Sequence, residues 1–179
     1  MITLEQVGEY SRQIFHVEKD GKRLYVIKLE ETEFNFYDGA GVMLYSLRYN
    51  DWEAIRRGKD GKGRYEVFSC ETRIGTFDPM PKYYNHCGMN LNNSNYYIKK
   101  KMFKNEYILF NELGELASVQ KVDSSAEPDK YVAYVVSNEI TDDIICLMLL
   151  FIDMRWNASS GEVLDLSDEI GICGKPPKY

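Results

Sequence analysis

Short segments rich in aliphatic and aromatic residues, each ended by a polar turn, make up most of the chain. Residues 12–18 and 23–29 are strand-like, and the Asp20-Gly21 pair between them is a strong hairpin signal. Further strand–turn–strand units follow over residues 33–49, 64–77 and 106–122. Strands do not alternate with helices, which disfavours a parallel sheet. The pattern predicts about ten to twelve short antiparallel strands over residues 12–137, after a frayed end or short turn over residues 1–8.

An unbroken apolar run over residues 144–152 differs from everything before it. Thr141 is a good N-cap, Asp142 and Asp143 suit the positive end of a helix dipole, and Arg155 lies near the negative end. A helix without a polar stripe must be enclosed by protein or by lipid. Because a membrane span needs roughly 20 apolar residues, the run predicts a helix over residues 141–156 that is enclosed by protein.

Together these elements predict a mainly β (α+β) fold in one domain over residues 1–179. A closed antiparallel β-barrel wrapped around the C-terminal helix would bury every face of that helix and leave no exposed strand edges. Residues 162–179 contain aliphatic positions but end in Lys-Pro-Pro-Lys-Tyr. We expect this C-terminal tail to pack a short segment across the barrel mouth before fraying.

The hairpins over residues 34–46 and 107–118, the RIGTF segment at residues 73–77, and the apolar helix after residues 131–136 carry a resemblance to a known family. Over about residues 12–156, the chain resembles the tubby C-terminal domain-like superfamily. That group includes tubby-like proteins, plant LURP-one-related proteins, phospholipid scramblases and small bacterial relatives. Tubby proteins bind phosphoinositides through basic residues, and scramblases are linked to phospholipid movement. The resemblance implies a non-catalytic barrel that binds a ligand, an anionic lipid surface or a protein.

The composition and charge of the chain limit the kinds of partner that it is expected to bind. The 179 residues are 44% hydrophobic and 28% charged, as in a soluble globular protein, and the net charge is −6. This acidic balance argues against nucleic acid, because phosphate contacts dominate such binding. The start of the chain lacks the pattern of a signal peptide and no run is long enough for a transmembrane segment, so we expect a cytoplasmic protein. The sequence assigns no oligomeric state.

Residues suited to catalysis or metal binding do not form a recognisable motif. The four cysteines (Cys70, Cys87, Cys146 and Cys173) include no C-x-x-C pair, and neither a G-x-S-x-G nor a P-loop motif is present. His86 and Cys87 are adjacent, but neighbouring residues on a strand point to opposite faces. The glycine-rich residues 57–64 are better explained as a solvated loop than as a phosphate cradle. We therefore expect no enzyme activity, no cofactor and no metal.

One local basic cluster, Lys99, Lys100, Lys101 and Lys104, is the candidate binding site. These lysines could meet anionic lipid headgroups and place the protein at the periphery of a membrane, since each charge contributes about 1 kcal/mol near such a surface. Alternatively, they form a charged edge that blocks aggregation, which is the favoured interpretation. A different class of function also fits the small size and acidity, namely an immunity or antitoxin-type protein that neutralises a partner protein.

Overall fold

The computed structural model describes residues 1–7, 13–30, 33–50, 64–78, 86–101, 104–122 and 129–154. Twelve strands and one helix lie within these ranges. They are β1 (Ile2–Gln6), β2 (Ile14–Lys19), β3 (Lys22–Glu30), β4 (Glu33–Asp38), β5 (Met43–Asn50), β6 (Arg64–Ser69), β7 (Thr72–Asp78), β8 (His86–Leu91), β9 (Ser94–Lys100), β10 (Glu106–Asn111), β11 (Gly114–Val122), β12 (Lys130–Val135) and α2 (Asp142–Ile152).

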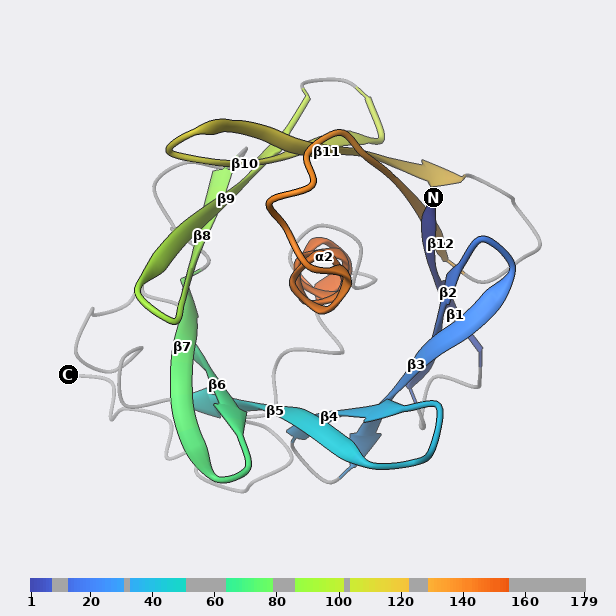
Figure 1. Ribbon diagram of the computed structural model, residues 1–179, viewed down its shortest axis with the longest axis vertical. Helices are drawn as coiled ribbons and strands as arrows, with labels where there is room; N and C mark the ends of the chain where they lie inside the picture. Colours follow the sequence, from blue (N-terminus) through green and yellow to red (C-terminus); the bar gives the residue numbers. More distant parts are fainter. Residues whose placement is uncertain are drawn as a thin grey trace, which may run out of the picture.

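The strands form one closed antiparallel barrel in which each strand pairs with its neighbours in the chain, and β1 pairs with both β2 and β12 (Figure 1). The predicted mainly β architecture, an antiparallel barrel with one helix near its C-terminal end, is confirmed. No helix among the described residues is long and apolar enough to cross a membrane.

The first strand corrects the prediction for the start of the chain, where residues 1–8 were expected to form a frayed end or a short turn and the strands to begin at residue 12. Instead, Ile2 pairs with Ala133 and Leu4 pairs with Tyr131, and both aliphatic side chains point into the barrel and are fully buried. The alternation of Ile2 and Leu4 is a short strand signal whose partner lies about 130 residues away, beyond the reach of local patterns.

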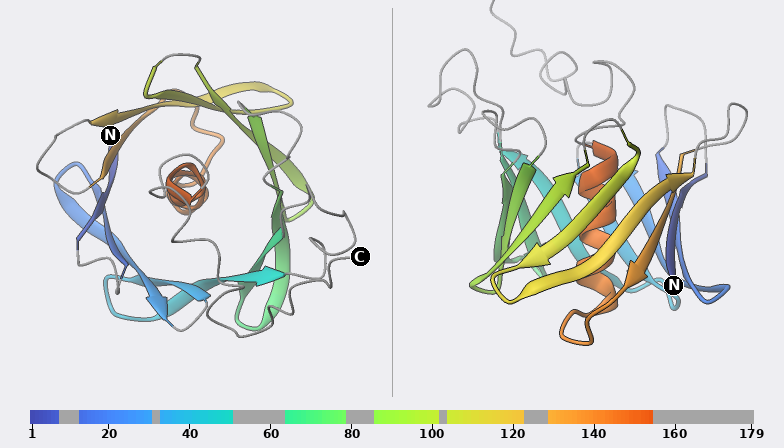
Figure 2. Two further views of the ribbon diagram at one scale, coloured as in Figure 1. Left: turned by 180° about the vertical axis from the view of Figure 1, so that it is seen from behind. Right: turned by 90° about the horizontal axis from the view of Figure 1, so that it is seen from above.

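Five tight hairpin turns, at residues 20–21, 39–42, 70–71, 92–93 and 112–113, lie at one end of the barrel together with the start of α2 (Figure 2). We call this the turn end and the opposite end the loop end. Several of these turns need positive φ, which Gly21 and Gly41 adopt at no steric cost and Asn92 and Asn93 tolerate. The turn end is the face seen in Figure 1.

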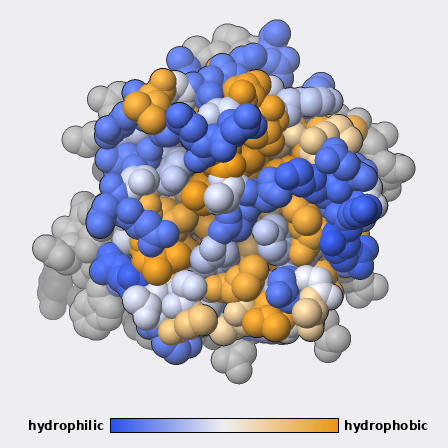
Figure 3. Space-filling view, in the orientation of Figure 1, coloured by the Kyte–Doolittle hydropathy of each residue, from blue (hydrophilic) through white to orange (hydrophobic). Residues whose placement is uncertain are grey.

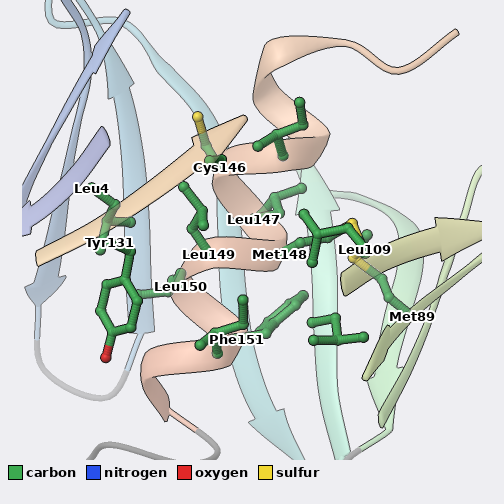
Figure 4. Close-up of a cluster of buried hydrophobic side chains, with 14 of the residues drawn as sticks. Leu4, Met89, Leu109, Tyr131, Cys146, Leu147, Met148, Leu149, Leu150 and Phe151 are labelled. Atoms are coloured by element: carbon green, nitrogen blue, oxygen red, sulfur yellow. The ribbon is translucent and has the colours of Figure 1, made fainter. Parts of the chain in front are cut away.

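Helix α2 runs along the barrel axis, and its side chains fill the interior (Figures 1 and 4). Every residue from Ile145 to Ile152 has 0% of its surface exposed. Phe151 stacks on Phe77 of β7 with ring centroids 3.8 Å apart, so the helix packs directly on the barrel wall. The sequence predicted this helix over residues 141–156. It spans Asp142–Ile152 and continues into a π-helical turn at Asp153 and Met154, while residues 155–179, including the predicted tail, lie outside the described residues.

Gly75, within the RIGTF segment, lies where β7 closely approaches β8. A Cβ added at this residue would lie 2.1 Å from the Asn90 carbonyl oxygen of β8. The neighbouring pairing of β6 with β7 is irregular between Val67 and Phe68, as expected where a bulge changes the strand direction. Only glycine therefore fits at this position without a shift of the β8 backbone.

Candidate functional site

The four lysines of the predicted cluster differ in their exposure and in their contacts. Lys99 and Lys101 are exposed, whereas Lys100 is half-buried with its Nζ 5.7 Å from the centroid of the Tyr107 ring. Lys101 Nζ lies 2.9 Å from Glu106 Oε2, and Lys104 Nζ lies 3.8 Å from Glu106 Oε1. Glu106 thus brings Lys101 and Lys104 together and offsets part of their charge.

The electrostatics of these groups agree with that geometry. The hydrogen bond to Glu106 raises the pKa of Lys101, and the same bond lowers the pKa of Glu106. Lys99 lies opposite His86 on the neighbouring strand, and the pKa of His86 is lowered by burial first and by the Lys99 charge second. The four lysines therefore do not make one uncompensated cationic surface.

Two carboxylates at the start of α2 contact the barrel wall at the turn end. Lys19 Nζ of β2 lies 2.8 Å from Asp142 Oδ2, and the Tyr45 hydroxyl of β5 donates a hydrogen bond to Asp143 Oδ2. Both acids lie in the first helical turn, where the helix dipole favours them, as predicted. Thr141 occupies the cap position but makes no side-chain capping bond, which corrects its predicted role.

A buried polar pair marks the other end of the helix. The Tyr131 hydroxyl of β12 donates a hydrogen bond of 2.7 Å to Asp153 Oδ1, and Asp153 is only 6% exposed. Burial raises the pKa of Asp153 from its ordinary value of 3.8 to about 6, although the Tyr131 bond acts in the opposite direction. Lys121 and Asp129 form an ion pair of 2.7 Å nearby. Sequence reasoning missed this pair, whose one local signal is an acid at the end of an apolar run.

The structure describes three of the four cysteines, and Cys173 lies outside the described residues. Cys87 and Cys146 are buried in the core and Cys70 is exposed in the turn between β6 and β7. Burial raises the pKa of Cys146 well above its usual range, which keeps this thiol protonated. Within the described residues, no group of three histidine, cysteine or acidic side chains is placed to hold a metal ion.

Exposed apolar side chains are unevenly distributed. Of the eight exposed large hydrophobic residues that the structure describes, only Val122 lies at the loop end. The others lie at or beside the turn end, where hydrophobic and hydrophilic patches interleave over the surface (Figure 3). Sequence reasoning missed this feature, because it depends on which hairpin tips share one end of the barrel.

Three comparisons with known proteins add information on the fold alone. No protein-family model and no curated protein matches the chain. The X-ray structure of a protein from Arabidopsis thaliana is similar, with a TM-score of 0.55 and 14% sequence identity, over 86% of this chain and 90% of that chain. The same barrel architecture therefore occurs in a chain of very different sequence.

Proposed function

We propose that this protein is a non-catalytic, tubby-like barrel domain whose role is to bind a protein partner on its outer surface. The observation that carries the proposal is the concentration of exposed apolar side chains at the turn end. Apolar side chains exposed together at one end of a molecule favour an interaction site at that end. The side chains of α2 occupy the barrel interior, which favours binding outside the barrel over binding within it.

Among the three kinds of partner that the resemblance implies, the charge distribution favours protein over anionic lipid. Glu106 neutralises part of the lysine cluster, and the net charge of the chain is −6. An acidic surface is repelled by the negative potential of an anionic membrane. The same acidity supports the second candidate function, an immunity-type protein that neutralises a basic partner.

Affinity capture from the native host tests the proposal. The whole chain serves as bait at physiological salt, and flotation with vesicles containing phosphatidylserine is measured in parallel. We expect a stoichiometric protein partner and no flotation. Flotation without any captured protein would overturn protein binding in favour of lipid binding, and a captured toxin whose activity is inhibited would select the immunity-type role.

A further inference from the structure

Three exposed apolar residues lie on the outer surface at the turn end. We define the apolar strip as Leu113, Tyr134 and Val136, which are 80%, 50% and 63% exposed. Leu113 lies at the tip of the β10–β11 hairpin, and Tyr134 and Val136 lie at and just beyond the end of β12. Tyr134 pairs with Ser118, and the Val136 amide donates to the Leu116 carbonyl, so these two residues lie along the β11–β12 seam and Leu113 lies beyond the start of β11.

Carboxylates lie close along the chain to two residues of this strip. Glu112 and Glu115 flank Leu113 in the hairpin, and Glu139 follows Val136 in the segment that leads to α2. All three are exposed, and Glu112 Oε1 accepts a hydrogen bond of 3.2 Å from the Asn95 side-chain amide. Within the part of the chain that the structure describes, neither Glu112 nor Glu139 forms an ion pair with a lysine or arginine. A cationic partner side chain could therefore approach the strip from either end without displacing a resident lysine or arginine.

The charge of the strip's surroundings selects among possible occupants. A second copy of this chain that docked by the same strip would bring glutamates against glutamates, and like charges at a close interface repel. An anionic membrane would meet the same repulsion. A protein segment with apolar side chains between lysines or arginines would satisfy both features, because the apolar groups bury the strip while the cations pair with its rim.

Resting on the proposed function, we infer that the apolar strip is the docking site for a basic segment of the partner protein, in which apolar residues alternate with cationic ones. Leu113 and Val136 are the apolar anchors. Glu112, Glu115 and Glu139 select the sign of the partner's charge and speed its association.

The chain supplies a matched control for this inference. Val42, in the β4–β5 turn, is 56% exposed at the same end of the barrel, but it belongs to a hairpin on another side of the barrel wall (Figure 1). Val136→Ser and Val42→Ser therefore make the same chemical change at similar exposure. Only the first alters the strip.

Binding is measured by fluorescence anisotropy with three labelled peptides, of alternating lysine and leucine, lysine and serine, and glutamate and leucine. We expect the lysine–leucine peptide to bind at least about tenfold more tightly than the other two. Val136→Ser or Leu113→Ser should weaken that binding by about tenfold or more, whereas Val42→Ser should leave it unchanged. Equal effects of Val136→Ser and Val42→Ser, or equal binding of the lysine–serine peptide, would overturn the inference.

Two further arms separate the sources of a failure. Flotation of the wild-type chain on phosphatidylcholine vesicles that is lost with Val136→Ser would assign the strip to a membrane and overturn the inference. Capture of the same host protein by the wild type and by Val136→Ser would overturn the strip as the docking site while the proposed function stands. Failure of the wild type to capture any protein would overturn the proposed function itself.

Discussion

The buried carboxyl of Asp153 makes the stability of the fold depend on pH in an unusual direction. Its pKa rises from 3.8 to about 6 on folding, so between these values the folded chain holds a proton that the unfolded chain releases. The free energy of unfolding contributed by this group therefore falls as pH rises from about 4 to 6 and is constant above that range. The rise in pKa corresponds to roughly 3 kcal/mol of lost stability at neutral pH.

Asp153→Asn removes the ionisation but keeps an oxygen that can accept the Tyr131 hydroxyl hydrogen bond. We expect this variant to be more stable than the wild type at pH about 7.5, by up to roughly 3 kcal/mol. The difference should disappear near pH 4, where the wild-type carboxyl is protonated in the folded chain. Tyr131→Phe should have the opposite effect, lowering stability at neutral pH by about 1–3 kcal/mol, because the buried carboxylate loses its donor.

Urea denaturation followed by circular dichroism at both pH values measures these differences. Asp20→Asn is the control, because Asp20 is an exposed aspartate in the β2–β3 turn, and a surface change of this kind should alter stability by less than about 0.5 kcal/mol. Identical stability of Asp153→Asn and the wild type at both pH values would refute the reasoning. A gain in Asp153→Asn that is the same at both pH values would assign the effect to packing and not to ionisation.

Three further predictions follow from the packing and the surface charge. Gly75→Ala should lower the free energy of unfolding by about 3 kcal/mol or more, because the added Cβ would meet the β8 backbone. Gly39→Ala is the control and should change the free energy of unfolding little, because open space surrounds Gly39. Equal urea midpoints for the two variants would contradict the close approach at Gly75. Leu147 and Leu149 point about 200° apart on the helix, and replacing either with aspartate should lower the free energy of unfolding by several kcal/mol. If either variant is soluble with a near-normal melting temperature, the helix is not enclosed on all sides. Changing residues 99–101 to glutamate should leave capture of the partner protein unaltered. Loss of capture would show that the lysine cluster takes part in binding the partner.

The sequence predicted those parts of the fold that local patterns encode. Hairpin signals such as Asp20-Gly21 and the apolar run before Asp153 were sufficient to predict an antiparallel barrel with a late helix. The closure of the barrel by β1 was not predicted, because Ile2 pairs with Ala133 and no local pattern records such a partner. The lysine cluster was visible, but its compensation was not, since Glu106 reaches Lys101 only through the β9–β10 pairing.

The polar pairs at the two ends of α2 resolve a problem that an all-apolar helix creates. Hydrophobic burial is non-directional, so side chains such as Leu147 and Leu150 alone would specify the depth and rotation of the helix only weakly. Asp142 and Asp143 bind Lys19 and Tyr45 at the turn end, and Asp153 binds Tyr131 at the loop end. A shift by one residue, about 1.5 Å of rise and 100° of rotation, would break these pairs and leave the buried Asp153 without its donor. Asp153 thus lowers the stability of the fold at neutral pH, while its hydrogen bond with Tyr131 favours one depth and rotation of the helix.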